Sequence, residues 1–456
     1  MIFMEEIIGL AKRRGFFYPS SGIYGGLANT WDFGHYGTLL KNNIRDLWVK
    51  KFVTDRDDML IVDSSIILNP KVWEASGHVA GFADSMVDCK TCKMRTRADH
   101  LIEEKVKGSK VEGLPVEALT KIIKDNKLKC PKCGSESLTD ARRFNLLFET
   151  KVGMVEETKS KAYLRGELAQ GIFMNYKQVI DTMRVKLPFG IASVGSCFRN
   201  EITLGQGVFR TLQFDLMELE YFINPKNWKA EFDKWKDMMS SFAEELGLDM
   251  KNIRFREHEE HERSHYSSRT VDLEYKYPQG YKEMWGLAYR TDYDLKNHMK
   301  HSGTNLKFRD NKTNEQYIPH VIEPTFGLSR LLITILVDAY RDEDIGDKKR
   351  IVLKLSPRLS PVKAAVFPLQ KDLKLSEYAT KLYRDIKSEF VTEYDDSGNI
   401  GKMYRRQDEI GTPVCVTVDY KSLEDDMVTV RDRDTMKQER ISVSKIKDYI
   451  KIKIAG

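Results

Sequence analysis

The chain has 456 residues, of which 41% are hydrophobic and 31% are charged, a composition typical of globular proteins. This length exceeds what one hydrophobic core usually organises, so two or three domains are expected. The 74 basic and 68 acidic residues leave a net charge of +6, which permits a nucleic-acid partner without requiring one. No stretch approaches the roughly 18 apolar residues of a membrane span, so no membrane partner is expected.

The N-terminal segment and the cysteines predict a cytoplasmic protein. In residues 1–15, Lys12, Arg13 and Arg14 follow the apolar positions, which is the reverse of a secretory signal and indicates a short amphipathic helix. Four of the six cysteines form two close pairs and two stand alone. This usage suits a reducing compartment better than a disulfide scaffold.

The apolar periodicity predicts an antiparallel sheet with helices, which is an α+β domain. Helices are predicted over residues 38–53, 224–248 and 327–340, and strands over 59–68, 191–202, 209–223, 283–288 and 317–323. The first strand ends at Pro70, and the glycine-containing loop 203–208 joins the next two strands into a hairpin.

A second domain of the α/β type is predicted from about residue 357, after the charged stretch 341–350 and two prolines. Its predicted elements are strand 363–367, helix 376–389 and strands 414–418 and 427–431. We therefore expect domains at 1–356 and 357–456, with an insertion at about 86–140 and a helical insertion at about 224–270.

The predicted hairpin carries the strongest chemical signal. If side chains alternate along its strands, Arg199 and Glu201 share one face, and Arg210, Phe214 and Glu218 share one face of the partner strand. At about 3.3 Å per residue, Phe214 and Glu218 are roughly 13 Å apart, close to the span from adenine to the amino group of an aminoacyl-adenylate. The alternative is a charged, solvent-facing side of an antiparallel sheet.

These segments resemble the signatures of the class II aminoacyl-tRNA synthetases. Phe-Arg-Asn-Glu at 198–201, followed by Arg-x-x-x-Phe at 210–214, resembles the second signature, and Gly-Leu-Ser-Arg at 327–330 resembles the third. The helix and strand before Pro70 are similar to the first, which in that class builds the dimer interface.

Longer stretches resemble one family within this class, the dimeric single-chain glycyl-tRNA synthetases. They are IYGGLANTWDFGHYGTLLKNNI (23–44), GHVAGFADSMVDCKTCKMRTRADHLIE (77–103), RGELAQG (165–171), WGLAYRTDYDL (285–295) and VIEPTFGLSR (321–330). The resemblance implies a catalytic domain with a zinc-ribbon-like insertion, a C-terminal anticodon-binding domain and a homodimer. It also implies that the protein activates glycine with ATP and Mg²⁺ and transfers it to the 3′-terminal adenosine of tRNA(Gly).

The resemblance further implies roles for individual residues. Implied in ATP binding are Arg199, Asn200, Glu201, Phe209, Arg210, Thr211, Leu212, Gln213, Phe214, Glu283, Met284, Gly327, Leu328, Ser329 and Arg330. Implied in glycine binding are Arg97, Glu167, Phe214, Asp215, Leu216, Met217, Glu218, Glu323, Pro324, Thr325, Phe326 and Gly327. Arg199, Glu201 and Arg330 are expected to be catalytic through positioning and electrostatics, with Glu283 the nearest candidate ligand for Mg²⁺.

The acidic residues agree with a pocket for a small ammonium compound. Glu167, Glu218 and Glu323 offer three carboxylates to an ammonium group, and such crowding leaves little room for a β-carbon. The chain departs from the usual family pattern at several positions, of which Thr325, in place of serine, adds a methyl group beside the substrate. The other departures are Gly166, Leu168, Leu212, Gln213 and Ser329.

Two cysteine pairs predict a metal site. Cys89 and Cys92, with Cys130 and Cys133, have the spacing of a four-thiolate structural zinc site, although 37 residues separate the pairs. The alternative is two chance pairs in a reduced protein.

Three histidines with spacing i, i+3 and i+7, at 258, 261 and 265, are predicted to form a polar face or a substrate loop rather than a metal site.

Two alternative functions and one surface remain open. A non-catalytic synthetase relative, such as a polymerase accessory subunit or regulatory binding module, would not need the arginines and glutamates that are present here. A class II ligase for another small amino acid would differ in its pocket. Lys402, Arg405 and Arg406 are candidates for contact with the tRNA backbone, or form an ordinary charged surface.

Overall fold

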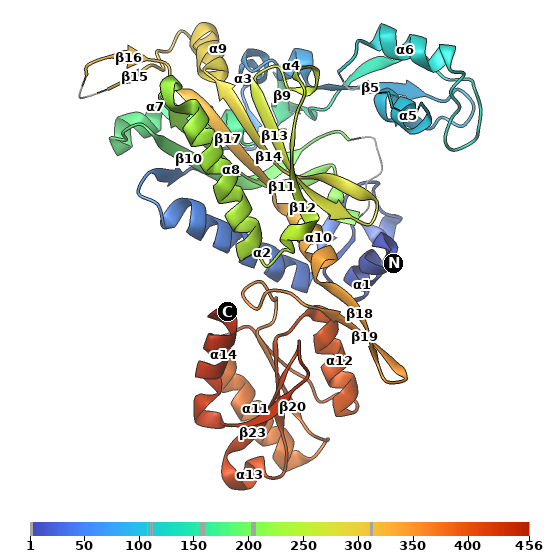
Figure 1. Cartoon of the computed structure of the whole chain (residues 1–456), viewed down its shortest axis with the longest axis vertical. Helices are drawn as coiled ribbons and strands as arrows, with labels where there is room; N and C mark the ends of the chain where they lie inside the picture. The colour runs from blue at the N-terminus through green and yellow to red at the C-terminus, as the bar shows by residue number, and fades with distance from the viewer. Residues whose placement is uncertain are drawn as a thin grey trace.

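A seven-stranded sheet forms the centre of the molecule (Figure 1). The computed structural model describes residues 3–106, 108–109, 111, 113–154, 160–201, 207–310 and 313–455. In spatial order, the strands of the sheet are β12 (Ile253–Glu257), β13 (Arg269–Tyr277), β14 (Gly280–Thr291), β17 (His320–Gly327), β11 (Gln213–Ile223), β10 (Phe189–Phe198) and β3 (Met59–Ile61). Neighbouring strands are antiparallel except β3 and β10.

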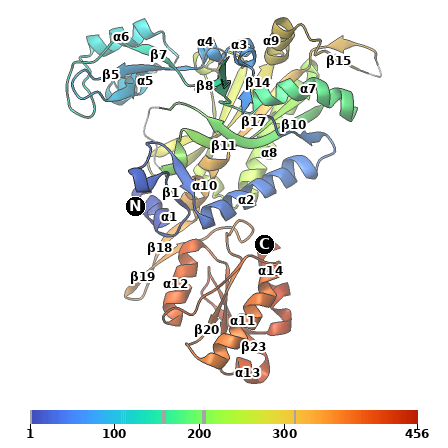
Figure 2. The same ribbon diagram turned by 180° about the vertical axis from the view of Figure 1, so that it is seen from behind.

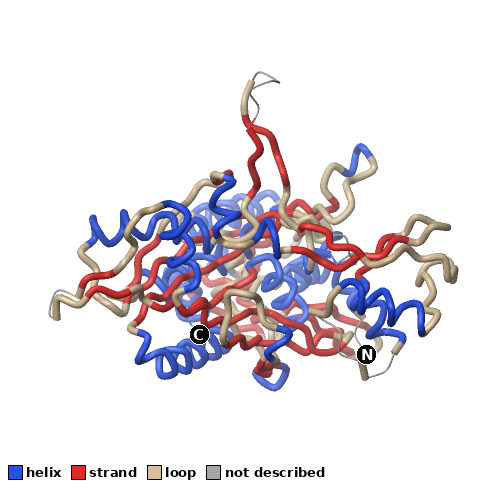
Figure 3. The backbone as a smooth tube through the Cα atoms, turned by 90° about the horizontal axis from the view of Figure 1, so that it is seen from above, coloured by secondary structure: helices blue, strands red, loops and turns tan. Residues whose placement is uncertain are grey.

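The two faces of this sheet are covered differently, as the central strand β11 illustrates. Met217, Leu219 and Tyr221 point into the main hydrophobic core, because side chains alternate along a strand. This face is covered by α1 (Met4–Arg13), α2 (His35–Val49), α8 (Trp228–Glu245) and α10 (Leu328–Ala339). The opposite face packs on α7 (Ala169–Met183) and α9 (Tyr293–Ser302) at one end only. Seen from above, strands run through the middle of the molecule among the helices, and other strands project beyond it (Figure 3).

A small unit stands out from one end of the sheet (Figures 1 and 2). It contains the three-stranded sheet β6-β5-β7 and two helices, packed on a separate hydrophobic cluster that includes Val87, Leu101 and Ile123. Its elements are β5 (Ala83–Asp88), β6 (Arg95–Arg97), α5 (Ala98–Lys105), α6 (Val116–Asp125) and β7 (Arg142–Asn145).

The C-terminal part forms a second body at the other end of the molecule (Figure 2). Its sheet has the order β21-β20-β22-β23-β24, in which β20 runs parallel to β21 and β22. The elements are β20 (Ala364–Pro368), α11 (Leu373–Lys387), β21 (Thr392–Tyr394), α12 (Ile400–Ile410), β22 (Val414–Val418), α13 (Ser422–Asp425), β23 (Met427–Asp432), β24 (Gln438–Ser442) and α14 (Ile446–Ala455). Buried Asp408 joins it to the preceding hairpin, because it accepts hydrogen bonds from both Arg350 and Arg431.

The remaining elements are short. They are β1 (Phe17–Pro19), β2 (Trp31–Phe33), β4 (Ile67–Leu68), α3 (Pro70–Ala75), α4 (His78–Gly81), β8 (Glu149–Val152), β9 (Ser160–Leu164), β15 (Phe308–Arg309), β16 (Gln316–Tyr317), β18 (Tyr340–Ile345) and β19 (Lys348–Leu353). Within the described residues, no helix combines the length and the apolar character that a membrane span needs.

Three predictions of secondary structure are wrong. The predicted strand 59–68 is two strands, β3 and β4, that belong to different sheets, and Pro70 starts helix α3. Residues 224–270 are not helical throughout, because β12 pairs with β13 at the sheet edge. The charged stretch 341–350 is not a break but most of the hairpin β18–β19, in which the charged side chains are largely exposed except for the buried Arg350. The predicted loop 203–208 lies mostly outside the described residues.

Candidate active site

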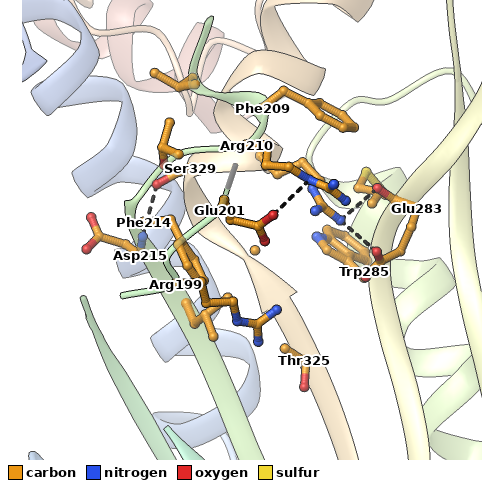
Figure 4. A pocket seen from close by; sticks show the side chains of 16 residues that line it. Arg199, Glu201, Phe209, Arg210, Phe214, Asp215, Glu283, Trp285, Thr325 and Ser329 are labelled. Atoms are coloured by element: carbon orange, nitrogen blue, oxygen red, sulfur yellow. Dashed lines mark hydrogen bonds and ion pairs between the residues drawn. The ribbon is translucent and has the colours of Figure 1, made fainter. Parts of the chain in front are cut away.

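A pocket lies on the sheet where β10 ends and β11 begins, beside β14 and β17 (Figure 4). Together with its open mouth, the pocket has about 740 Å³ of empty space. It is lined by Arg199, Glu201, Val208, Phe209, Arg210, Thr211, Phe214, Asp215, Leu216, Glu283, Met284, Trp285, Thr325, Gly327, Ser329 and Arg330. Most of the residues implied in ATP binding therefore surround one cavity.

Arg199 is held on the pocket floor by a hydrogen bond and by contacts with two aromatic rings. Its Nε donates to the carbonyl oxygen of Gly166 over 3.0 Å. The guanidinium carbon lies 5.2 Å from the ring centre of Phe82 and 5.3 Å from that of Phe214. Because neither contact involves a carboxylate, the positive charge of Arg199 is not cancelled by an ion pair in the described structure.

The opposite wall contains two further arginines beside carboxylates. Arg330 Nη1 lies 2.9 Å from Glu283 Oε2 and donates to the Glu283 carbonyl over 3.0 Å. The Arg330 guanidinium lowers the pKa of Glu283, so this carboxyl is ionised at neutral pH. Arg210 is more loosely held, with Nε 3.8 Å from Glu201 Oε2. The pocket thus concentrates three cations, as a polyphosphate site requires.

The predicted alternation of Arg199, Glu201 and Arg210 along strands is wrong. Strand β10 ends at Phe198 and β11 begins at Gln213, so these three side chains belong to the connecting segments. The ladder stops because the backbone N–H groups of Asn200 and Leu212 donate to Leu146 and Asn29 instead. Only Phe214 and Glu218 share a strand face as predicted.

The three predicted pocket glutamates are buried and come together around an arginine. Arg290 Nη1 donates to Glu323 Oε1 over 2.8 Å and Arg290 Nη2 lies 3.7 Å from Glu167 Oε1. Glu218 Oε2 accepts the backbone N–H groups of Leu168 and Ala169 over 2.6 and 3.1 Å. The hydroxyl group of Thr325, in the pocket wall, donates to Glu218 Oε1 over 3.3 Å and connects the cavity to the glutamates.

The glutamates are therefore less available than the sequence suggested. Burial raises the pKa of Glu167, but His78, with Nε2 3.2 Å from its carboxylate, and Arg290 lower it by more than that. The pKa of Glu167 therefore lies below its ordinary value. Asp294 accepts two more hydrogen bonds from Arg290, over 2.8 and 2.9 Å. Carboxylate oxygens that are fixed by such partners form a preorganised acceptor set for an ammonium group.

Sequence reasoning missed Arg290, Asp294 and His78. The signal for the first two was present, since Arg290 and Asp294 lie four residues apart within the stretch 285–295. Their ion pair became recognisable only when β14 placed Arg290 between Glu323 and Glu167. His78 also lies in one of the stretches that resemble the family, 77–103, but no local pattern there indicated a contact with Glu167.

Several residues implied by the resemblance do not line the cavity. Met217, Phe326 and Leu328 point into the main core, as the strand period requires for the first two, and Pro324 lies on the same buried face of β17 as Phe326. The Asp215 carboxylate turns away to Lys41 on α2, 2.6 Å distant, although its backbone borders the pocket (Figure 4).

Other implied residues lie beside the cavity. Arg97 belongs to the outlying unit, where it pairs with Asp84 and Asp99. Asn200 and Leu212 anchor the segments that frame the pocket through backbone hydrogen bonds, and Gln213 is exposed.

The four paired cysteines are brought together as predicted. Cys89 Sγ lies 3.6 Å from Cys133 Sγ, and Cys92 Sγ lies 3.6 Å from Cys130 Sγ. All four sulfur atoms lie within 4.8 Å of one another. Both pairs form the same turn: Lys93 N donates to Cys89 O and Gly134 N to Cys130 O, each over 2.9 Å.

The three histidines have separate surroundings. His258 Nε2 lies 2.7 Å from Asp272, His265 Nε2 lies 3.0 Å from the Ser76 carbonyl oxygen, and His261 lies in a short turn between them.

Comparison with known proteins agrees with this geometry. The class II core domain of the tRNA synthetases for G, H, P, S and T matches residues 148–339, and an anticodon binding domain matches residues 363–453. A glycine–tRNA ligase of Caldanaerobacter subterraneus subsp. tengcongensis is 50% identical over 455 residues, covering 99% of this chain and 98% of the relative. The Geobacillus thermodenitrificans enzyme is 50% identical over 457 residues, with 99% and 98% covered. The Bacillus cereus enzyme is 48% identical over 458 residues, with both chains fully covered. The chain belongs to the glycine–tRNA ligase family of class II aminoacyl-tRNA synthetases.

Proposed function

We propose that the protein activates glycine with ATP to glycyl-adenylate and transfers the glycyl group to the 3′-terminal adenosine of tRNA(Gly). The observation that carries this proposal is the continuity between a three-arginine pocket and a buried, acidic, arginine-clamped cluster, joined at Thr325. The first suits a triphosphate and the second an ammonium group.

The chemistry needs no nucleophilic side chain, because the glycine carboxylate attacks the α-phosphate. Arg199 would contact the reacting α-phosphate. Arg210 and Arg330 would bind the outer phosphates as negative charge moves onto pyrophosphate. The adenine would stack on Phe214, displacing or sharing the face that Arg199 occupies. The ionised Glu283, half exposed at the pocket edge, would hold Mg²⁺, which neutralises phosphate charge when bound.

The small size of the amino acid is proposed to be selected by sterics. Glu167, Glu218 and Glu323 would accept the ammonium hydrogens, and Thr325 would close the space that a side chain needs. Exclusion must be steric because a pocket discriminates one methylene by only about 1 to 3 kcal/mol. Arg97 is less suited to direct contact, since its guanidinium pairs with two aspartates.

A structural zinc ion is proposed at the four cysteines. A tetrahedral site with Zn–S bonds of about 2.3 Å separates its sulfur atoms by about 3.8 Å. The two 3.6 Å separations match this geometry. Zinc bound there would hold the two similar turns together and so stabilise the outlying unit.

A homodimer is proposed from exposed apolar side chains near the N-terminus and the sheet edge. Ile23, Tyr24 and Leu27 are 90%, 87% and 62% exposed, and Ile61 on the edge strand β3 is 49% exposed. Clustered exposed apolar groups and an unpaired strand edge favour association. Sedimentation as a monomer at micromolar concentration would contradict this part of the proposal.

The C-terminal body is proposed to bind the tRNA anticodon. Lys402 and Arg405 are exposed on α12 and remain candidates for backbone contact, whereas Arg406 pairs with Asp395 over 2.5 Å. The predicted cytoplasmic location stays a prediction.

Aminoacylation of tRNA(Gly) with labelled glycine tests the whole proposal. Charging should require ATP and should be lost in Arg330→Ala, which breaks the Glu283 pair. A non-catalytic relative would give no charging with any amino acid, and a ligase for another small amino acid would charge a different tRNA.

A further inference from the structure

Glu220 is a completely buried carboxyl group without a described partner. It lies two residues beyond Glu218 on the same face of β11, and its side chain is 0% exposed. Neither of its carboxyl oxygens has a hydrogen-bond partner in the described part of the chain. An ionised carboxylate in such a place is strongly disfavoured, so the group is expected to keep its proton.

Two other carboxyl groups lie close to Glu220. The pairing of β11 with β17 places Glu218 opposite Thr325 and Tyr221 opposite Ile322, which puts Glu220 opposite Glu323. One oxygen each from Glu218, Glu220 and Glu323 lies within 4.8 Å of the others. A neutral Glu220 can therefore donate its hydroxyl to an oxygen of a neighbouring carboxyl group.

The charged groups around Glu220 come from several elements and are mostly negative. Glu218 lies on β11, Glu323 on β17, Asp294 on α9 and Arg290 on β14, with Glu167 just before α7. The N–H groups of Arg290 that are near this set already point to Asp294 and Glu323. Burial, and then the charge of Glu323, raise the pKa of Glu220 well above its ordinary value.

We propose that Glu220 is a positioning residue of the amino-acid pocket, a neutral carboxylic acid that donates a hydrogen bond to Glu323. Glu323 is then fixed from two sides, by Arg290 on Oε1 and by Glu220 on its other oxygen. Because Glu220 is neutral, it adds no further negative charge to the buried pocket. This inference rests on the proposed function, in which Glu323 accepts the ammonium group of glycine.

The first test uses no substrate. Glu220→Gln keeps the size and an N–H donor but cannot ionise. In the wild type, the folded protein holds a proton that the unfolded chain releases above pH of about 4.3, so its stability falls as the pH rises. Glu220→Gln should therefore have a higher Tm than the wild type, and the difference should widen from pH 6 to pH 8.

Matched variants make this result interpretable. Glu323→Gln replaces the buried carboxyl that accepts a hydrogen bond from Arg290, so it should lower the Tm at both pH values. A Glu220→Gln protein that is destabilised, or that shows the same Tm difference at pH 6 and pH 8, would overturn the proposal. A rise in Tm on adding Mg²⁺ or Mn²⁺ to the wild type but not to Glu220→Gln would also overturn it, since the three carboxyls would then form a cation site.

The second test separates positioning from general packing through glycine-dependent pyrophosphate exchange. Glu220→Gln should keep the glycine KM within about threefold of the wild type, whereas Glu220→Leu, which has no donor, should raise it about tenfold or more with little change in the KM for ATP. Equal increases in both variants would contradict the role of the donor. Failure of the wild type to exchange with glycine would count against the proposed function alone, because the Tm comparison needs no glycine.

Discussion

Arg290 and Glu323 form a fully buried ion pair, with Arg290 Nη1 2.8 Å from Glu323 Oε1 and the arginine side chain 0% exposed. Arg290 also lies 3.7 Å from the ring centre of Tyr266, which closes the other side of its guanidinium. One arginine thus orients Glu323 and Asp294 and approaches Glu167. The acidic pocket is organised by a cation that is not itself available to the substrate.

Removing this cation should be strongly destabilising. Arg290→Met leaves Glu323 and Asp294 buried without their shared partner, and such a loss costs about 3 to 5 kcal/mol. Urea unfolding of Arg290→Met and of the wild type at pH 7 measures this loss in the free energy of unfolding. In the control Arg254→Met, the lost pair with Glu274 involves an arginine that is 52% exposed, so the loss should be at most about 1 kcal/mol. Similar losses in both variants would show that the Arg290 pair is not the organising contact.

Arg199 and Glu218 should affect different steps. Arg199→Ala removes a preorganised cation from the reacting phosphate, so the activation rate should fall by a factor that corresponds to about 2 to 4 kcal/mol. Glu218→Gln weakens an acceptor used in the ground state, so the glycine KM should rise while ATP binding changes little. Single-turnover adenylate formation, titrated separately in glycine and ATP, distinguishes them. If both variants weakened ATP alone, the orientation of the adenylate from Phe214 towards Glu218 would be wrong.

Much of the architecture was predictable because it depends on local patterns. Strand β22 and helix α10 have strong apolar periodicity, and both were predicted within about a residue of their ends. The end of β10 at Phe198 and the start of β11 at Gln213 were not, since they depend on hydrogen bonds to Leu146 and Asn29 from distant segments.

The candidate site was also predictable only in part from the sequence. Motif spacing brought the three pocket arginines together, but a motif read as a continuous range also included Met217 and Phe326, which point into the core. The clamp by Arg290 depends on long-range pairing of β14 with β17, which no local pattern reveals.

Acidification should destabilise the protein partly through His298. Burial lowers the pKa of His298 to about 4, while its Nε2 lies 2.8 Å from Gln170 Oε1. Between pH 6.5 and 4 the unfolded chain takes up a proton on His298 that the folded protein does not. The contribution of neutral His298 to the free energy of unfolding is therefore fully present above pH 6.5 and is lost as the pH falls towards 4. For this one group, the free energy of unfolding changes by at most about 1.4 kcal/mol per pH unit.

Urea unfolding at pH 5.0 to 7.0 can isolate this contribution. In His298→Gln the loss of stability on acidification should be smaller than in the wild type. His301→Gln, which alters an exposed histidine on the same helix, should follow the wild type. Parallel pH profiles for all three proteins would exclude His298 as the source.

The paired cysteines should bind about one zinc ion per chain. Metal analysis of protein that is purified without chelator measures the ratio. Cys130→Ser should lose the metal and loosen the outlying unit, whereas Cys415→Ser, a buried cysteine in the C-terminal sheet, should retain it. Wild-type protein without zinc would remove the site.

The central claim is that this pocket activates glycine and no other amino acid. Amino-acid-dependent exchange of labelled pyrophosphate into ATP, measured with each of the standard amino acids, tests it most directly. If the clamped glutamates and Thr325 exclude a β-carbon, as proposed, glycine alone should support rapid exchange. Exchange with alanine or serine that equals or exceeds the rate with glycine would contradict the account.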